Sequence, residues 1–179
     1  FLINQHQVSS VSDAEAYISR LNGVKLASEQ LVEGLKLRAD KGIIAPKFVF
    51  PYVISDSQNI ITGAPFSDTE EKSTLWADIN KKVNALDAPQ DKKDQLLADA
   101  KKALINSVKP AYTDLISSLN ELEKKADTRD GVWKLPEGDD FFNMRLSRVT
   151  TTDMSSETIH KLGLSEVARI HDEMRTIMK

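Results

Sequence analysis

The chain has 179 residues, of which 40% are hydrophobic and 28% charged, so it is long enough for one ordinary domain with a real core. It contains no cysteine, which excludes disulfides, thiolate metal sites and a cysteine nucleophile. The net charge of −3 gives no electrostatic reason to expect nucleic acid or an anionic membrane as a partner. No apolar run approaches the roughly 20 residues that span a bilayer.

The first helices are marked by a capping pattern and by helical spacing. Ser12-Asp13-Ala14-Glu15 is a capping box, and the apolar residues behind it recur every three or four positions. A second helix is expected from about Val24 to Asp40, and Gly42 supplies a left-handed end to it. The apolar positions of the first helix are Ala14, Tyr17, Ile18 and Leu21.

The segment between Pro46 and Pro51 reads Lys-Phe-Val-Phe, which suits either a short strand or a loop. We favour a loop, with Pro51 at the first position of a helix that runs to about Ile60. Ser67-Asp68-Thr69-Glu70 is a second capping box and predicts that another helix comes after it. The apolar face of that helix comprises Leu75, Trp76, Ile79, Val83 and Leu86.

A turn at Ala88-Pro89 precedes the longest helical pattern, from about Gln90 to Ala126. Its apolar residues repeat every three or four positions, which indicates one long packed helix or a pair of helices. Pro110 lacks a backbone donor and clashes with the preceding turn, so a kink is expected there. The apolar set is Leu97, Ala100, Leu104, Val108, Ala111, Leu115, Leu119 and Leu122.

Residues 127–138 are predicted to form a loop, and Asp139 is expected to cap the short helix after it. The triplet Thr150-Thr151-Thr152 is stiff at χ1 and poorly helical, so the helix is expected to end there. The apolar residues of this helix are Phe141, Phe142 and Leu146.

Ser155 restarts the helical pattern, with Met154 and Ile159 at the positions of a hydrophobic staple. Gly163 is expected to close this short helix and Ser165 to open the last one. No stop signal appears before the chain ends, so we expect the amino-terminal part of a larger protein. The residues of the last helix that are expected to face inward are Leu164, Val167, Ile170, Met174 and Ile177.

Together these elements predict an all-α fold, a multi-helix bundle-like array of about seven to eight helices with a long kinked central helix or helix pair. The sequence contains no internal repeat and no clear linker. Residues 1–179 are therefore expected to form a single helical region.

Two histidines near the end of the chain are candidates for chemistry. Glu157-x-x-His160 places a carboxylate and an imidazole on one helix face, which is half of a di-iron bundle motif. Only one copy is present, so a surface hydrogen bond is the favoured interpretation. His171 lies at the edge of the apolar stripe, where we expect a partly buried structural histidine.

The polar run from Arg148 to Asp153 is the best candidate for a functional surface, because it interrupts a helical protein and loops carry binding groups disproportionately. The favoured alternative is an interhelical connection whose threonine hydroxyls satisfy one another. Trp133 is either a substrate platform or, as we favour, an amphipathic ring that caps the core. Phosphate-binding loops are absent, since the glycines never cluster.

Several short motifs occur in a fixed order along this chain. The clearest are 131–139 (GVWKLPEGD), 150–153 (TTTD), 157–164 (ETIHKLGL) and 166–170 (EVARI). Weaker matches lie at 13–17 with Arg20-Leu21, at 45–49 and at 108–112. In these motifs the chain resembles the bacterial family catalogued as domain of unknown function 885.

The resemblance implies a mostly helical bacterial protein, exported or lipid-anchored, that is similar to zinc-dependent peptidases. Their signature is His-Glu-x-x-x-Gly-His-His, in which histidines bind zinc and the glutamate activates the bound water. His6, His160 and His171 stand alone in this chain, so no catalytic, metal or cofactor-binding residue is assigned to it. Zinc is expected in the parent protein, at a periplasmic or extracellular location.

The resemblance thus implies a non-catalytic helical part that walls the substrate channel of a metal-dependent peptidase-like protein. Its partners would be the remainder of the parent chain and peptides, and not nucleic acid. A free-standing interaction module that packs through the Leu97–Leu122 stripe is the alternative, and exposed apolar helix faces could form a homodimer. The expected channel surface comprises Arg148, Thr150, Thr151, Thr152, Asp153, Trp133 and His160.

Overall fold

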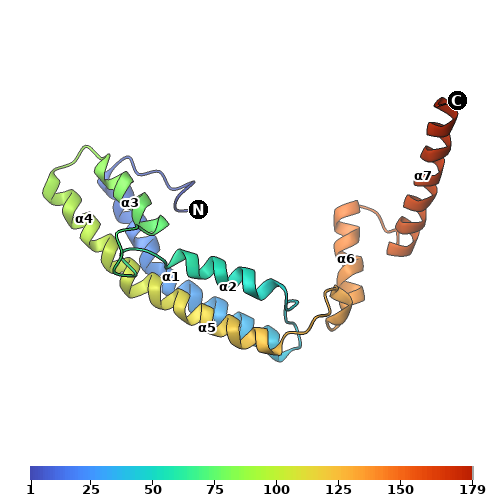
Figure 1. Ribbon diagram of the computed structural model, residues 1–179, viewed down its shortest axis with the longest axis horizontal. Coiled ribbons are helices and arrows are strands. Elements are labelled where there is room, and N and C mark those ends of the chain that lie inside the picture. The colour runs from blue at the N-terminus through green and yellow to red at the C-terminus, as the bar shows by residue number, and fades with distance from the viewer. Residues whose placement is uncertain (179) are drawn as a thin grey trace. The chain divides into compact units, whose positions relative to one another are not determined.

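The computed structural model describes residues 1–178, which form helices and their connections, and this confirms the predicted all-α class (Figure 1). The helices α4, η1 and α5 run on without interruption, so the described residues hold six separate α-helical elements, slightly fewer than the seven to eight predicted. The elements are α1 (Val11–Asp40), α2 (Val49–Ile60), α3 (Thr74–Asn84), α4 (Gln90–Ala103), the π-helical turn η1 (Leu104–Val108), α5 (Lys109–Lys125), the 3₁₀ turn η2 (Val132–Lys134), α6 (Gly138–Thr150) and α7 (Ser156–Ile177).

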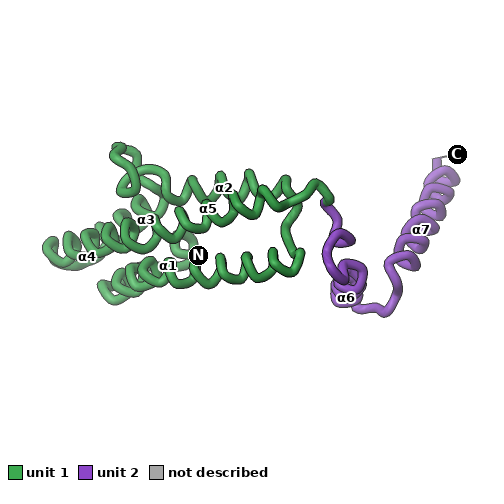
Figure 2. Tube along the Cα trace, turned by 90° about the horizontal axis from the view of Figure 1, so that it is seen from below, with its two compact units in different colours: residues 1–129 green, residues 130–179 purple. Residues whose placement is uncertain are grey.

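The chain divides into two compact units (Figure 2). Unit 1 comprises Phe1–Arg129 and contains α1 to α5. Unit 2 comprises Asp130–Lys179 and contains η2, α6 and α7. The single helical region predicted over residues 1–179 thus contains two compact units.

Helix α1 begins two residues earlier than predicted and does not stop where a second helix was expected. Ser10 is the N-cap: its hydroxyl accepts from the Asp13 N–H at 3.2 Å, and the Asp13 carboxylate accepts from the Ser10 N–H at 2.9 Å. The prediction of Ser12 as the cap was wrong, because Ser10-x-x-Asp13 satisfies the same motif two residues earlier. Gly23 stays within the helix, since one interior glycine costs only about 1 kcal/mol. Gly42, with φ of 76°, ends it as predicted.

Helix α2 confirms the predicted loop before it, although it begins at Val49 rather than Pro51. The second predicted capping box, Ser67–Glu70, was wrong. The segment before α3 folds back on itself through hydrogen bonds between Ala64 and its partners Glu71 and Ser73, at 2.7 and 2.8 Å. Ser73 is the N-cap of α3, and its hydroxyl accepts from the Trp76 N–H. Local capping patterns occur in loops as well, so this motif alone could not place the helix.

The long helix from α4 to α5 is continuous, and its predicted kink at Pro110 takes the form of the π-helical turn η1 just before it. Proline offers no N–H to the carbonyl one turn back, so the helix widens locally rather than leaving a strained α-turn. Figure 1 shows α4 and α5 as one curved element. The apolar stripe predicted along it faces the interior of unit 1, where Ala100, Leu104 and Val108 are completely buried.

Unit 1 contains two apolar clusters. The first core joins α1, α3, α4 and η1, and Tyr17 and Leu21 of α1 are completely buried in it. The second core joins α2 and α5. Their buried members are, in the first, Ala14, Tyr17, Ile18, Leu21, Phe66, Ile79, Val83, Leu86, Leu96, Ala100, Ala103, Leu104 and Val108, and in the second, Phe50, Ile54, Leu119 and Leu122.

Unit 2 buries no large apolar side chain among its described residues. Its helix α7 is uninterrupted, so the predicted break at Gly163 and Ser165 was wrong: the Ser165 hydroxyl donates to the Leu162 carbonyl within the helix. The expectation of an inward-facing stripe was also wrong. Leu164, Val167, Ile170, Met174 and Ile177, which we call the α7 stripe, are between 43% and 84% exposed.

The other predicted boundaries of unit 2 are close to those observed. Helix α6 begins after Glu137 rather than at Asp139, which lies in its first turn. It ends at Thr150, as the threonine triplet predicted, and Thr151 comes next in the left-handed region with φ of 54°. Ser155 is the N-cap of α7, as expected, and its hydroxyl accepts from the Thr158 N–H at 3.2 Å.

Candidate functional site

The turn that carries Trp133 depends on two glycines. A Cβ at Gly131 would overlap the indole of Trp133, and one at Gly138 would overlap the carbonyl of Val132. Only glycine permits both close approaches. The Trp133 side chain is 63% exposed, so it does not cap a core of the described residues, and the favoured sequence interpretation was wrong. Its open ring remains a candidate platform for a ligand or for another part of a protein.

The threonine triplet forms a self-contained hydrogen-bond group. The Thr150 hydroxyl donates to the Leu146 carbonyl at 2.9 Å and lies 3.0 Å from the Thr152 hydroxyl. The Thr151 hydroxyl donates to the Thr150 carbonyl at 2.7 Å. This is the geometry expected of an interhelical connection with satisfied hydroxyls. The flanking Arg148 and Asp153 are exposed, and neither side chain forms a hydrogen bond or ion pair with a described residue.

His160 lies on the exposed surface of α7, one turn after Glu157, but these two side chains form no hydrogen bond. Glu157 instead pairs with Lys161, with 2.7 Å between Nζ and Oε1. His171 is exposed as well, so the prediction of a partly buried structural histidine was wrong. Helix α7 has no covering element within unit 2, so both imidazoles are exposed.

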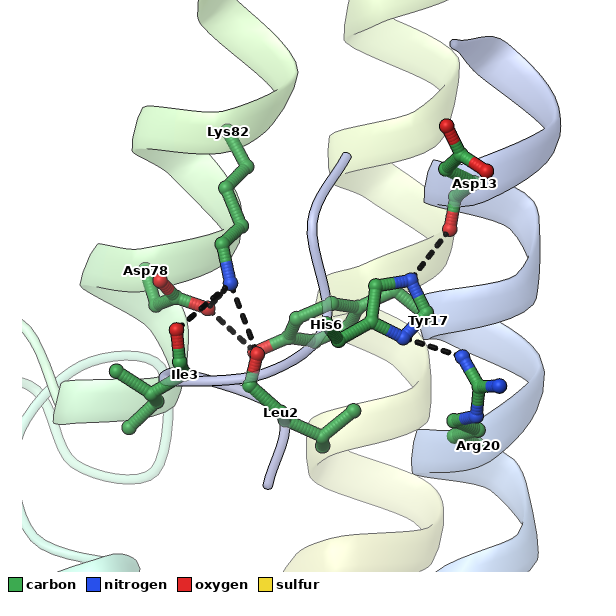
Figure 3. A network of polar contacts seen from close by, with 8 residues as sticks. All are labelled: Leu2, Ile3, His6, Asp13, Tyr17, Arg20, Asp78 and Lys82. Carbon is green, nitrogen blue, oxygen red and sulfur yellow. Dashed lines mark hydrogen bonds and ion pairs between the residues drawn. The ribbon is translucent and has the colours of Figure 1, made fainter. Parts of the chain in front are cut away.

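A partly buried polar network in unit 1 was not singled out from the sequence (Figure 3). The Tyr17 hydroxyl, on a fully buried residue, donates to Oδ2 of Asp78 at 2.9 Å. The same oxygen accepts from the Lys82 ammonium at 2.8 Å. Lys82 also donates to the carbonyls of Leu2 and Ile3, at 2.8 and 3.2 Å. Helix α1, helix α3 and the chain start are thereby joined at one point.

His6 continues this network on the other side of the Tyr17 ring, which it meets edge-on with 5.2 Å between ring centroids. Its Nδ1 contacts the Arg20 guanidinium, and its Nε2 lies 3.0 Å from the Asp13 carbonyl. A guanidinium can only donate, so Nδ1 accepts and the Nε2–H donates to the carbonyl. The neutral imidazole is held in one tautomer and fastens residues 1–9 to α1.

Two pKa shifts accompany this network. Burial, and then the hydrogen bond to Asp78, raise the pKa of Tyr17, so its phenol remains protonated and donating at any physiological pH. The hydrogen bond from the Ser10 hydroxyl, followed by that from the Ser9 N–H, lowers the pKa of Asp13. Both shifts favour the protonation states that the hydrogen bonds require. The arrangement stabilises the fold, because it joins α1, α3 and the chain start.

Two cavities of unit 1 differ in chemistry. The larger, of about 500 Å³, lies between α1 and α5 and is lined mainly by charged and small polar side chains. The other, of about 300 Å³, is lined only by apolar residues where α1, α2 and α5 converge. We call the second the apolar cavity; its lining is Leu31, Leu35, Ile43, Ile44, Ala45, Val49, Phe50, Val53, Leu115, Leu119 and Leu122.

The His, Asp and Glu side chains of residues 1–178 do not form the zinc site that the family resemblance implies for the parent protein. Within residues 1–178, no three His, Cys, Asp or Glu side chains gather closely enough to hold a metal ion. Both ring nitrogens of His6 are already engaged by Arg20 and Asp13. The carboxylates beside His160 and His171 are paired within α7, with Lys161 and with arginines of the same helix.

Comparison with known proteins identifies the family. The model of the family described as bacterial protein of unknown function (DUF885) matches residues 1–179, the whole chain. The chain belongs to this family. The recognition of DUF885 from its short motifs is therefore confirmed. No curated protein matches this DUF885 chain significantly.

A solved structure described as "the putative lipoprotein from Colwellia psychrerythraea" has a similar fold. It matches with a TM-score of 0.82 and 21% sequence identity, over 97% of this DUF885 chain and 29% of its own length. At that identity the likeness shows the fold alone. This chain thus spans less than a third of the solved chain that it matches. Across residues 1–178, no helix is both long and apolar enough to cross a bilayer.

Proposed function

We propose that this chain is the non-catalytic helical part of a larger secreted or periplasmic peptidase-like protein, which it completes by packing against the remainder of the polypeptide. One observation carries the proposal. The α7 stripe runs the length of a 22-residue helix, and its five side chains are at least 43% exposed. An amphipathic helix gains most of its stability by burying such a face.

The charges of α7 support the same interpretation. Arg169 pairs with Glu166 and Glu173, and Arg175 pairs with Asp172, at 2.7 to 2.8 Å and all within the helix. The charged side chains of α7 therefore pair within the helix, whereas its apolar face has no covering element within unit 2. A covering surface need not supply charge and needs to be apolar. The fold match over 29% of a longer chain supports a covering surface from the same polypeptide.

The peptidase part of the proposal rests on the family resemblance and is tested by metal content. We expect the longer protein to hold one equivalent of zinc and to cleave peptides, and residues 1–179 expressed alone to do neither. Bound zinc would supply the activated water for hydrolysis. Elemental analysis and a peptidase assay measure both. Stoichiometric zinc in residues 1–179 that is lost in His160→Ala would contradict the proposal.

The channel part is tested at the end of α6. If Arg148 contacts peptide substrate, Arg148→Ala in the longer protein should raise KM about tenfold and leave kcat unchanged. The reason is that the lost contact binds the substrate and the transition state equally well. Arg145→Ala, at a position that is also exposed and on the same helix, is the matched control. If the two substitutions change KM equally, Arg148 does not contact substrate, and the assignment of the Arg148–Asp153 run to the channel surface is wrong.

The alternative of a free-standing interaction module also draws on the α7 stripe. The Leu97–Leu122 stripe, which the sequence suggested for such a module, is engaged inside unit 1, where Ala100, Val108 and Leu119 are buried. A free-standing module would have to use α7 instead. Both alternatives leave the α7 stripe uncovered in residues 1–179. They are separated by whether the remainder of the polypeptide covers the stripe, which unfolding of Ile170→Ala in both lengths of the protein measures.

A further inference from the structure

The connection between α1 and α2 combines exposed aromatic and apolar side chains with unpaired cations. We call residues 38–52 the α1–α2 corner. It lies at the end of unit 1 where α5 also ends, and the Lys47 N–H donates to the Asp127 carbonyl at 3.0 Å (Figure 1). Its exposed hydrophobic residues are Ile43 at 40%, Phe48 at 58% and Tyr52 at 71%.

The cations of the corner have no partner within the described chain. Arg38, Lys41 and Lys47 are exposed, and none makes a hydrogen bond or ion pair through its side chain with a described residue. The one acid of the corner is Asp40. Elsewhere in unit 1 several cations do have partners: Lys82 binds Asp78, for example. In a chain of net charge −3, this corner is a local positive site.

We propose that the α1–α2 corner docks on an anionic lipid surface. Aromatic rings prefer the boundary between headgroups and acyl chains, and lysine and arginine bind the phosphates above it. Phe48 and Tyr52 lie one helical turn apart at the start of α2, with Lys47 directly before them. The corner therefore offers both attractions within residues 47–52.

The apolar cavity adds to this docking surface. Ile43, Ile44 and Ala45 of the corner line it together with residues of α1, α2 and α5, and no polar side chain lines it. A cavity of about 300 Å³ that no polar side chain lines suits a hydrocarbon rather than a headgroup. An acyl chain of a lipid bound at the corner fits this cavity. The cavity therefore favours lipid over an acidic protein as the partner of these cations.

Co-sedimentation of residues 1–179 with vesicles tests the proposal. We expect binding to vesicles that contain phosphatidylglycerol, weaker binding to phosphatidylcholine alone, and a decrease with added salt. The variant Lys41→Glu/Lys47→Glu should bind anionic vesicles at least about tenfold more weakly, because two attractions become repulsions. Phe48→Ser/Tyr52→Ser should also weaken binding, with less dependence on salt.

Matched controls keep the result interpretable. Lys101→Glu reverses an exposed charge on α4, and Ile170→Ser/Met174→Ser removes apolar groups from the α7 stripe; both should retain wild-type binding. Far-ultraviolet circular dichroism confirms that every variant keeps its helix content. Equal binding to both kinds of vesicle, loss of binding in the α7 variant, or no binding at all would overturn the proposal, the last in favour of an acidic protein partner.

Discussion

Replacing Tyr17 with alanine is expected to lower the free energy of unfolding of unit 1 by about 3–5 kcal/mol, the largest effect that we expect of any single substitution. The ring is completely buried in the first core, so its removal leaves a cavity. The substitution also deprives Asp78 of a hydrogen-bond donor and Lys82 of the ring that lies 5.3 Å from its ammonium. Urea unfolding of residues 1–179 followed by circular dichroism measures the loss.

Two further variants separate packing from hydrogen bonding. Tyr17→Phe keeps the ring and should cost about 1–3 kcal/mol, because the Asp78 carboxylate loses a buried donor. Tyr52→Phe, at an exposed position, should stay within about 0.5 kcal/mol of wild type. If Tyr17→Ala and Tyr17→Phe cost the same, the ring does not fill the core. If neither costs stability, the network in Figure 3 does not form in solution.

Replacing Ile170 with alanine is expected to change the free energy of unfolding little in residues 1–179 alone and much more in the longer protein. In residues 1–179 alone the side chain is 43% exposed, so its loss should change the free energy of unfolding by no more than about 0.5 kcal/mol. In the longer protein, where we propose that the α7 stripe is covered, the same change should cost about 2–5 kcal/mol. Urea unfolding of both proteins gives the comparison.

Lys161→Ala is the control for this experiment, because Lys161 is on the same helix but in its charged face, paired with Glu157 on the surface. It should cost less than about 1 kcal/mol in both lengths. A similar small cost of Ile170→Ala in both would mean that the remainder of the polypeptide does not cover the α7 stripe. The interaction-module alternative would then be favoured.

Helix interiors in this chain could be predicted from the sequence, whereas several helix starts could not. The spacing of Leu75, Ile79 and Val83 located α3, because an apolar face of period 3.6 has few other interpretations. Its start was misplaced at Ser67, since serine three residues before an acid also occurs in loops. The correct cap, Ser73, precedes no acid at the third position and offers a weaker signal.

Glycine misled the prediction inside helices and guided it at their ends. Gly163 was expected to end a helix, and a separate helix was expected from about Val24, directly after Gly23. A Cβ at either glycine would meet nothing within 4 Å, so both lie on open helix surface. Gly42 ends α1 with a positive φ. The two kinds of glycine differ in their sequence context, because apolar periodicity continues past Gly23 and Gly163 and ceases after Gly42.

The polar network of unit 1 was missed because its partners are distant in sequence. Tyr17 and Asp78 are 61 residues apart, and Tyr17 was counted only as an apolar position of its helix. His6 stands in a segment with no periodicity, so nothing local indicated that it would be buried against Arg20. Periodicity reports which face of a helix is apolar, but not what covers it, and the α7 stripe was misjudged for that reason.

The π-helical turn at Leu104–Val108 limits how the long helix can change in length. A π turn holds one residue more than the α-helical turn it replaces, and so rotates all later side chains about the helix axis. Before it, Leu96 reaches the first core; after it, Leu119 reaches the second. The single extra residue of the π turn thus sets the rotation at which the side chains before it face the first core and those after it face the second. Insertions and deletions in homologous chains should gather in the loops and spare this helix, unless they occur in combinations that restore the phase.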